Sequence, residues 1–213
     1  MSTGRVLPNG RILRYTMEER VVHWLAALGY IYALLTGLAF YSPRLYWIAI
    51  VLGGGPTARA WHPWAGVIFA LATVAMYRAW APDMRINKLD RAWNKALRHY
   101  VRHEDDRLPP VGRYNAGQKY LFWLMFWGAL LLLVSGVAMW FTESIPWSLR
   151  WIRYVAVLVH VIAALITIGG FIIHVYMGTA VVRGGFTAVI RGEVSQRWAR
   201  VHHPLWLDEI TRK

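Results

Sequence analysis

The sequence predicts an all-α integral membrane protein, built as a four-helix bundle. Of its 213 residues, 57% are apolar and only 16% are charged, although 24 Lys and Arg against 11 Asp and Glu give a formal net charge of +13. The charges are therefore crowded into a few segments that separate long uncharged stretches, a pattern typical of membrane proteins. The 13 tryptophans agree with this class, because Trp and Tyr gather where bilayer and water meet.

Four segments are long and apolar enough to cross a bilayer, whose core of about 30 Å needs roughly 20 largely apolar residues in a helix. The predicted spans run over residues 21–41, 61–80, 120–141 and 153–177 of what we expect to be a single domain, 1–213. The backbone of a spanning segment must satisfy its own hydrogen bonds inside the bilayer, so all four are expected to be α-helices.

The connecting segments predict the orientation of the bundle. The N-terminal stretch, the loop between the second and third spans and the C-terminal tail carry 20 of the 24 Lys and Arg. The two remaining loops share only Arg44, Arg59, Arg150 and Arg153. The positive side should be cytoplasmic, which places both termini in the cytoplasm. Contact with anionic lipid headgroups explains the basic loops better than nucleic acid binding does.

The long loop between the second and third spans contains a predicted surface helix. From Asp83 to His103, apolar residues recur at spacings of three and four: Ile86, Leu89, Trp93, Leu97 and Val101. Such a spacing indicates an amphipathic helix on the cytoplasmic surface, ended by Pro109 and Pro110. On the outer side, Tyr46, Trp147 and Trp151 are expected to be interfacial anchors.

The chain has no cysteine, which excludes several classes of site. Disulfides, cysteine-ligated iron–sulfur clusters, zinc ribbons, covalently attached c-type haem and thiol nucleophiles all require one. Any metal chemistry must therefore depend on His, Met or carboxylate ligands. The first 20 residues are polar and basic, so no cleavable signal peptide is expected.

Four of the eight histidines lie in predicted spans, where an ionisable residue is costly and indicates function. The predicted topology puts His62 and His160 toward the outer surface, and His23 and His174 toward the cytoplasm. His160 and His174 are 14 residues apart, which is about 21 Å along one helix and within about 40° of one face. Each depth therefore offers two histidines.

Two histidines at one depth are the axial ligands that a low-spin b-type haem needs, and bis-His iron suits electron transfer. We therefore expect two b haems, one on His62 and His160 and the other on His23 and His174. A hydrogen-bonded structural role is the alternative for any one histidine. Copper or zinc fits less well, because neither pair has a carboxylate or cysteine nearby.

Glycines in the spans could give a flat macrocycle room, although close helix packing in membranes favours glycine equally. Gly66 follows His62 by one turn, Gly170 precedes His174 by one turn, and Gly37 and Gly136 interrupt other spans. The remaining histidines fall in polar segments and are expected to be solvated or to contact other parts of the protein: His99, His103, His202 and His203.

Several local strings resemble one known family, the diheme cytochrome b gamma subunits of respiratory formate dehydrogenases, along essentially the whole chain. The strings are Glu-Arg-Val-Val-His-Trp at 19–24, His-Pro at 62–63, Gly-Arg-Tyr-Asn-Ala-Gly-Gln-Lys at 112–119, Ile-His-Val-Tyr-Met at 173–177, and Val-Ser-Gln-Arg-Trp-Ala-Arg-Val-His-His-Pro at 194–204. The N-terminal stretch and the details of the long loop depart from the family.

The resemblance implies a subunit of a bacterial inner-membrane complex. A periplasmic catalytic alpha subunit would oxidise formate at molybdenum or tungsten, and an iron–sulfur beta subunit would pass the electrons to this chain. The His62/His160 haem would receive them, and the His23/His174 haem would deliver them to menaquinone or ubiquinone at the cytoplasmic side. Asn115, Gln118 and His174 match or adjoin the quinone site. This chain would not itself oxidise formate, and the complex could form a higher oligomer.

From the residues alone, Asn115 and Gln118 predict a capping box at the start of the third span. A capping role and a quinone role can coexist, since a helix N-terminus presents free N–H groups. Candidates for proton transfer to the quinone are on the cytoplasmic side: Asp105, Asp106, His99 and His103. Arg20 and Arg153 are candidate partners of haem propionates.

Two other functions stay open at this level. The chain could anchor another quinone-linked oxidoreductase, such as a hydrogenase, with the same haem chemistry. It could also be a transporter or sensor without haem, in which the membrane histidines bind a substrate or protons, although neither an internal repeat nor a pair of interrupted spans is evident.

Overall fold

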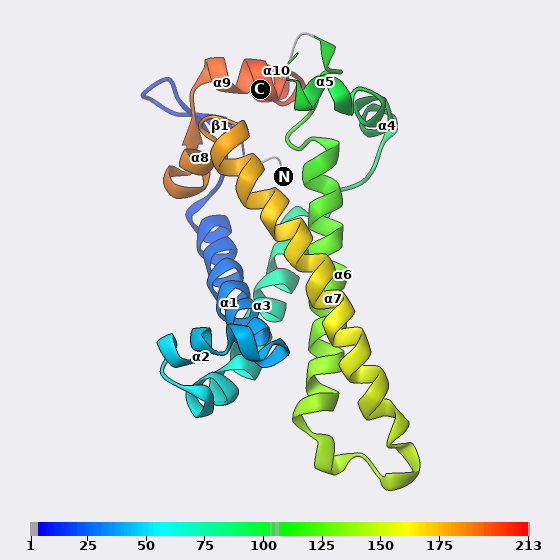
Figure 1. Ribbon diagram of the computed structural model, residues 1–213. Helices are drawn as coiled ribbons and strands as arrows, with labels where there is room; N and C mark the ends of the chain where they lie inside the picture. Colours follow the sequence, from blue (N-terminus) through cyan, green and yellow to red (C-terminus); the bar gives the residue numbers. More distant parts are fainter. Residues whose placement is uncertain (1–3, 103, 105–106, 213) are drawn as a thin grey trace. The chain divides into compact units, whose positions relative to one another are not determined.

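The computed structural model describes residues 4–102, 104 and 107–212. The chain divides into two compact units, each described by itself below, and Figure 1 labels its helices and strands. Unit 1 comprises Met1–Arg20, Ala79–Trp123 and Ile173–Lys213, and unit 2 comprises Val21–Arg78 and Leu124–Ile172. The expectation of a single domain over 1–213 stays a prediction.

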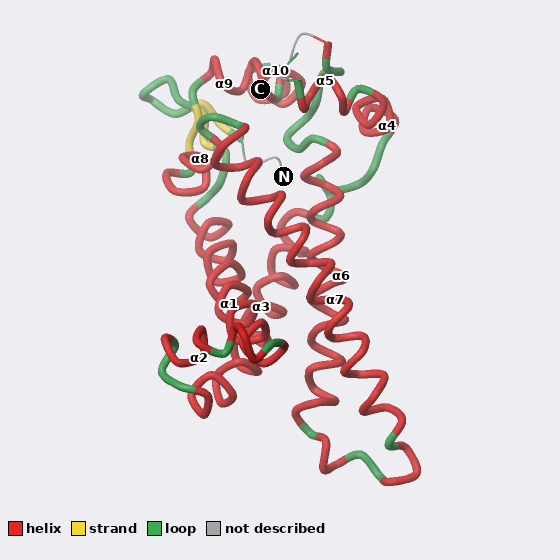
Figure 2. Tube along the Cα trace, in the orientation of Figure 1, coloured by secondary structure: helices red, strands yellow, loops and turns green. Residues whose placement is uncertain are grey.

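Four long helices run through unit 2 and extend into unit 1 at one end. They are α1 (Met17–Tyr41), α3 (Gly55–Trp80), α6 (Ala116–Trp140) and α7 (Trp151–Tyr176), and helix dominates the described chain (Figure 2). Each predicted span therefore falls on a helix. The helices begin two to six residues earlier than predicted. The prediction followed the apolar stretch of each span, and the polar residues that cap or extend a helix lie outside that stretch.

Among the described residues, three helices are long and apolar enough to cross a membrane: Met17–Tyr41, Ala116–Trp140 and Trp151–Val181. Helix α3 has a similar length of 26 residues. Its first half contains Trp61, His62 and Pro63, which lower its mean hydropathy. The fourth span and the cytoplasmic location of both termini stay predictions.

Small residues form much of the core of unit 2. Ala26 on α1, Ala72 on α3 and Ala129 on α6 are buried together with Tyr30 and Phe69. Large apolar side chains point outward instead, with Leu28 62% and Val134 70% exposed. Close packing on small residues with large apolar residues outside is the arrangement expected of helices in lipid.

The connections at the far ends of these helices carry short helical turns. These are η1 (Pro43–Leu45), α2 (Trp47–Val51), η3 (Thr142–Ser144) and η4 (Trp147–Leu149). Tyr46, Trp147 and Trp151 are all exposed here. Their exposure is consistent with the interfacial position predicted for them.

Unit 1 contains a small sheet that the all-α prediction missed. Strands β1 (Arg5–Val6), β2 (Ile12–Leu13) and β3 (Glu193–Val194) form an antiparallel sheet in that order. The sheet joins the N-terminal hairpin to the C-terminal tail. Two-residue strands have too few positions to display an alternating pattern, which is why the sequence gives no sign of them.

The C-terminal part of unit 1 is built from short helices. After α7, a π-helical turn at Met177–Val181 (η5) precedes α8 (Gly185–Arg191), α9 (Gln196–His202) and α10 (Pro204–Thr211). Ile12 of β2 packs in one apolar core with Trp206 and Ile210 of α10. The tail is therefore folded onto the N-terminal hairpin.

The predicted surface helix between Asp83 and His103 is two shorter helices, α4 (Lys88–Lys95) and α5 (Leu97–Val101). The side chain of Asn87 caps α4 through the backbone N–H of Asp90, so the helix starts five residues later than predicted. It ends at Ala96, whose backbone leaves the helical region. Ile86, Leu89 and Leu97 are exposed, whereas Trp93 is buried.

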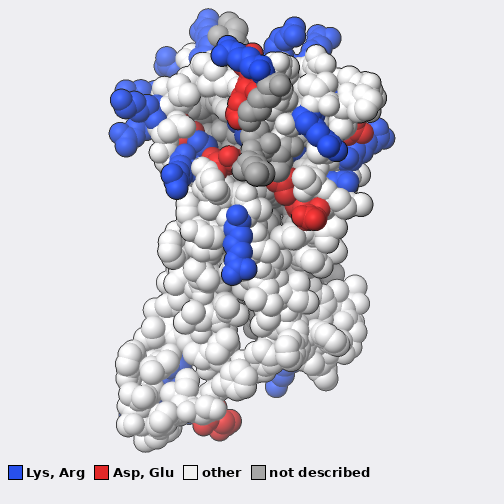
Figure 3. All heavy atoms as spheres, turned by 180° about the vertical axis from the view of Figure 1, so that it is seen from behind, with Lys and Arg blue, Asp and Glu red and all other residues white. Residues whose placement is uncertain are grey.

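Charged side chains are distributed very unevenly between the units. Unit 2 contains five of the 24 Lys and Arg, namely Arg44, Arg59, Arg78, Arg150 and Arg153, and a single acidic residue, Glu143. Lys and Arg therefore gather over unit 1, and most of the surface of unit 2 is uncharged (Figure 3). This division matches the charge pattern from which the topology was predicted.

Candidate functional site

Two of the predicted haem ligands lie close together in unit 2. His62 on α3 and His160 on α7 are half-buried, and their ring centroids are 6.3 Å apart. Two metal–nitrogen bonds of about 2 Å each, together with the distance from each nitrogen to its own ring centre, come close to this separation. The spacing of the two rings therefore suits one metal ion held between them.

Each of these rings is held by a hydroxyl from a neighbouring helix. Nδ1 of His62 lies 2.8 Å from Oγ1 of Thr36 on α1, and Nδ1 of His160 lies 2.9 Å from the Oγ of Ser135 on α6. Thr36 and Ser135 are themselves buried. Since Nδ1 is engaged in both rings, Nε2 is the nitrogen that each can offer to iron.

Glycines let the rings lie against the helix backbones. A Cβ at Gly37 would lie 3.4 Å from Cε1 of His62, and a Cβ at Gly136 would lie 3.3 Å from Cε1 of His160. One turn after His62, a Cβ at Gly66 would meet no atom within 4 Å. These contacts favour a specific role for Gly37 and Gly136 in seating the histidines.

The donor set suits a haem better than a metal ion held by protein alone. Across residues 4–102, 104 and 107–212, no group of three or more His, Cys, Asp or Glu could hold a metal ion. A macrocycle supplies the four equatorial nitrogens, so a haem iron needs only two protein ligands. His62 and His160 provide two histidines at a suitable spacing, which fits this requirement.

The other two membrane histidines belong to different units. His23 lies on α1 in unit 2, where its ring makes an edge-on contact with Trp24 at 5.7 Å between centroids. His174 lies near the end of α7 in unit 1, and its side chain is exposed. Their pairing on a second haem stays a prediction.

The predicted capping box at the start of α6 is present. The backbone N–H of Gln118 donates to Oδ1 of Asn115 at 2.9 Å, and the backbone N–H of Asn115 donates to Oε1 of Gln118 at 3.0 Å. Both side chains are half-buried. Each amide thus uses its oxygen within the cap, and its NH₂ group is the part that can donate to a ligand carbonyl.

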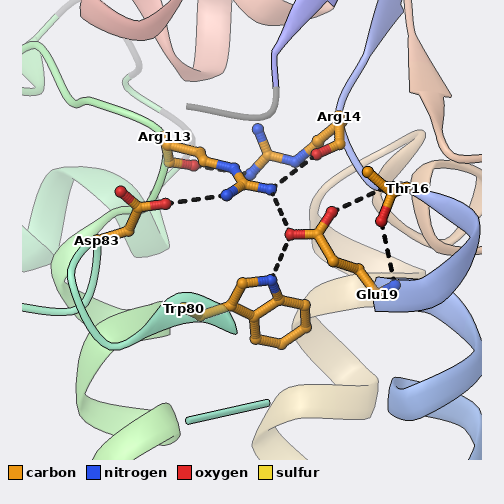
Figure 4. Close-up of polar contacts among 6 residues, drawn as sticks. All are labelled: Arg14, Thr16, Glu19, Trp80, Asp83 and Arg113. Atoms are coloured by element: carbon orange, nitrogen blue, oxygen red, sulfur yellow. Dashed lines mark hydrogen bonds and ion pairs between the residues drawn. The ribbon is translucent and has the colours of Figure 1, made fainter. Parts of the chain in front are cut away.

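A buried network of charges in unit 1 joins the start of α1 to the segment before α6 (Figure 4). Nη2 of Arg113 lies 2.8 Å from Oε1 of Glu19, and Nη1 lies 2.9 Å from Oδ2 of Asp83. Burial alone would lower the pKa of Arg113, but the neighbouring Tyr114 and Glu19 raise it above its usual value, so the guanidinium stays charged. The carboxylate of Glu19 also accepts from Nε1 of Trp80.

His203, expected to be solvated or in contact with another part of the protein, is buried in unit 1. Its Nε2 lies 3.0 Å from Nη2 of Arg14, and its Nδ1 lies 2.8 Å from the carbonyl oxygen of Gly112. The guanidinium only donates and the carbonyl only accepts, so the ring is neutral with its proton on Nδ1. Burial and the adjacent Arg14 lower the pKa of His203.

The remaining candidates are held by local contacts. Arg20 of α1 donates to the carbonyl oxygen of Ile190 in α8, and Arg153 of α7 donates to the carbonyl oxygen of Ile145 in the preceding loop at 2.8 Å. Nδ1 of His99 lies 2.6 Å from Oε2 of Glu104. The candidates His103, Asp105 and Asp106 lie outside the described residues.

Sequence reasoning missed Thr36 and Ser135. A signal was available, because each is a hydroxyl residue followed by glycine within an otherwise apolar span: Thr36-Gly37 and Ser135-Gly136. The two strings continue alike, with Leu38-Ala39 after the first and Val137-Ala138 after the second.

Comparisons with known proteins show which family the chain resembles. A family model described as prokaryotic cytochrome b561 matches residues 14–191, a range that contains all four membrane histidines. The chain is 37% identical to the formate dehydrogenase cytochrome b556(fdo) subunit of Escherichia coli (strain K12), over 94% of each chain. It is 32% identical to the nitrate-inducible formate dehydrogenase cytochrome b556(Fdn) subunit of the same strain, over 94% of this chain and 92% of the relative.

A third relative, the formate dehydrogenase cytochrome b556 subunit of Haemophilus influenzae, is 31% identical over 98% of this chain and 87% of its own. The comparisons confirm the resemblance that the local strings indicated. The matched range and the coverage show that the likeness extends through all four long helices. The chain belongs to the prokaryotic cytochrome b561 family.

Proposed function

We propose that this chain is the membrane cytochrome b subunit of a formate dehydrogenase and carries electrons from a periplasmic donor module to quinone. One b haem is held by His62 and His160, and a second by His23 and His174. Bound haem supplies a one-electron iron couple, with no open position when both axial ligands are histidines. The names of the relatives support the choice of formate dehydrogenase.

The observation that carries the proposal is the close pair of histidines in unit 2. His62 and His160 come from different helices, their ring centroids are 6.3 Å apart, and Nδ1 of each is taken by a hydroxyl. A structural histidine in a membrane needs partners for its polar atoms. Two neighbouring rings that each have Nδ1 engaged, and so can offer Nε2, are instead what a shared iron requires.

The proposed orientation follows from charge. Unit 1 contains 19 of the 24 Lys and Arg, so it lies at the cytoplasmic surface together with both termini, and the His62 and His160 end of unit 2 lies toward the periplasm. The basic segments contact anionic lipid headgroups in the inner membrane. The fourth span is α3, whose length of 26 residues suffices to cross a bilayer.

The proposed quinone site is made by Asn115, Gln118 and His174. The capping box turns the amide oxygens of Asn115 and Gln118 toward the helix N-terminus, and their NH₂ groups can donate to a quinone carbonyl. Quinone reduction takes two protons, and cytoplasmic uptake would contribute to a proton-motive force. Menaquinone and ubiquinone have the same two carbonyls, so this chemistry suits either.

The partners are a catalytic alpha subunit with molybdenum or tungsten and an iron–sulfur beta subunit. This chain transfers electrons and does not itself oxidise formate, because that step belongs to the molybdenum or tungsten centre of the alpha subunit. An anchor for a hydrogenase is the alternative. Affinity purification of the tagged chain separates the two: co-purified subunits that oxidise formate support the proposal, and subunits that oxidise hydrogen contradict it.

The haem scheme is tested by replacing each membrane histidine with alanine in the full chain. Removal of His62 or His160 should abolish the same b haem and leave the other in place. Removal of His23 or His174 should abolish the second haem and quinone reduction with it. His99→Ala, which changes a histidine of the polar loop, is the matched control and should leave both haems. Full haem content after His62→Ala would contradict the proposal.

A further inference from the structure

The hydroxyls beside His62 and His160 have only one proton each, and its position can be assigned. Oγ1 of Thr36 lies 2.7 Å from the carbonyl oxygen of Tyr32, and Oγ of Ser135 lies 2.6 Å from that of Leu131. A carbonyl oxygen can only accept, so each hydroxyl proton points back to its own helix. The same oxygen then has only lone pairs to offer to the imidazole.

The ring nitrogens opposite these oxygens must therefore be the donors. Nδ1 of His62 donates to Oγ1 of Thr36 at 2.8 Å, and Nδ1 of His160 donates to Oγ of Ser135 at 2.9 Å. With its proton on Nδ1, each neutral ring has a lone pair on Nε2, the form that a metal ion binds. Thr36 is fully buried and Ser135 is 5% exposed, so water hardly competes for these bonds.

The two arrangements are built alike on different helices. In each, a hydroxyl residue back-bonded to its own helix is followed by a glycine, and that glycine lies against the same histidine ring. Thr36 and Gly37 of α1 serve His62 of α3, while Ser135 and Gly136 of α6 serve His160 of α7. The same arrangement of a back-bonded hydroxyl, a glycine and a histidine therefore occurs twice, which indicates that the two hydroxyls have the same role.

We propose that Thr36 and Ser135 are positioning residues that fix His62 and His160 as Nδ1–H tautomers and lower the reduction potential of the iron between them. The inference rests on the proposed haem site. A hydrogen bond donated by Nδ1 makes Nε2 a more basic ligand, which favours the ferric state. Both hydroxyls act on one iron, so the loss of either should move the same haem in the same direction.

The test is a redox titration of the full chain, isolated with its natural subunits, for the variants Thr36→Val and Ser135→Ala. A contact of this kind changes metal affinity by about tenfold or more. If that change falls on the ferric form, the ferrous-to-ferric ratio at a fixed potential rises about tenfold, an upward shift of about 59 mV for a one-electron couple. The second haem should keep its potential.

Thr73→Val is the matched control. Thr73 is buried and its Oγ1 donates to the carbonyl oxygen of Phe69 at 2.8 Å, the same back-bond that Thr36 and Ser135 make in addition to their histidine contacts. Its replacement should leave both potentials unchanged. Thr36→Ser and Ser135→Thr keep the hydroxyl and should titrate like the unmodified chain.

Ser135→Ala removes a single atom, so it gives a folded variant even where Thr36→Val disturbs packing. If Ser135→Ala and Thr36→Val have full haem content and the same reduction potentials as Thr73→Val, the proposed role of the hydroxyls is overturned. The assignment of the haem ligands is unaffected by that result. An unmodified chain without two b haems would instead overturn the proposed function.

Discussion

Glu19→Gln should destabilise unit 1 strongly, because three donors converge on this one carboxylate. Its oxygens accept from the backbone N–H of Thr16 at 2.8 Å, from Nε1 of Trp80 at 2.6 Å and from Nη2 of Arg113 at 2.8 Å. Glutamine keeps one oxygen, and its NH₂ group must face at least one of these donors. The side chains of Glu19 and Arg113 are only 7% and 6% exposed, so water cannot substitute.

Breaking a buried ion pair by removing one partner costs about 3–5 kcal/mol. Asp83 still pairs with Arg113 in the variant and is 36% exposed, which places the expected loss at the lower end, about 3 kcal/mol. For a chain of this size, that corresponds to a melting point about 6–12 °C lower. Circular dichroism at 222 nm in detergent, at one scan rate, measures the difference.

Glu193→Gln is the matched control for this prediction. Glu193 pairs with Arg11 at 3.0 Å, but their side chains are 25% and 38% exposed, so its loss should cost less than about 1 kcal/mol. The reasoning is refuted if Glu19→Gln melts within error of Glu193→Gln.

Three further outcomes are expected. The free energy of unfolding should fall as the pH drops below about 6.5, the ordinary pKa of histidine. Burial and the adjacent Arg14 lower the pKa of His203 in the folded protein, so the unfolded chain takes up the proton first. His203→Gln should flatten that acid limb in a pH series of melting curves; an unchanged limb would assign it to other groups. Gly192→Ala should lower the stability more than Gly10→Ala. Both glycines have φ near +80°, but of the two only Gly192 would bring its new Cβ against a backbone atom, 2.6 Å from the carbonyl oxygen of Tyr15. Equal melting points for these two variants would show that this close approach carries no cost. Lys119→Met should destabilise the protein by about 3 kcal/mol, because it leaves the buried carboxylate of Asp90 without its 2.8 Å partner. Chemical denaturation of the variant and the unmodified chain measures this difference, and a loss below about 1 kcal/mol would contradict the prediction.

The sequence predicts the long helices well because two physical signals coincide there. Apolar length identifies the spans, and polar capping residues set where helices begin. The Asn115 and Gln118 cap was predicted and is present. Thr16 and Glu19 form the same motif at the start of α1, with the backbone N–H of Thr16 donating to the Glu19 carboxylate. Use of that motif would have placed the start of α1 correctly.

Contacts between distant segments could not be predicted in this way. Strand β3 pairs with β2 across about 180 residues, and no local pattern in two residues specifies such a partner. The burial of His203 depends on Arg14 and Gly112, which lie far away in the sequence. The break of the surface helix at Ala96 has no proline or glycine to announce it.

The sequence singles out the four membrane histidines, but it does not reveal that Thr36 and Ser135 contact the rings of His62 and His160. The predicted depth of His62 and His160 is argued from charge and helix length, whereas the hydroxyl that contacts each ring depends on how α1 faces α3 and how α6 faces α7. Helix facing is a tertiary property. Only the repeated hydroxyl-glycine string gave a local trace of it.

The central claim is that paired membrane histidines hold b haems, and a reduced-minus-oxidised optical spectrum with a pyridine haemochrome assay tests it most directly. The purified full chain should contain two low-spin b haems. His62→Ala and His160→Ala should each retain one haem, and it should be the same haem in both variants. A folded protein without haem, or variants that keep both haems, would contradict the claim.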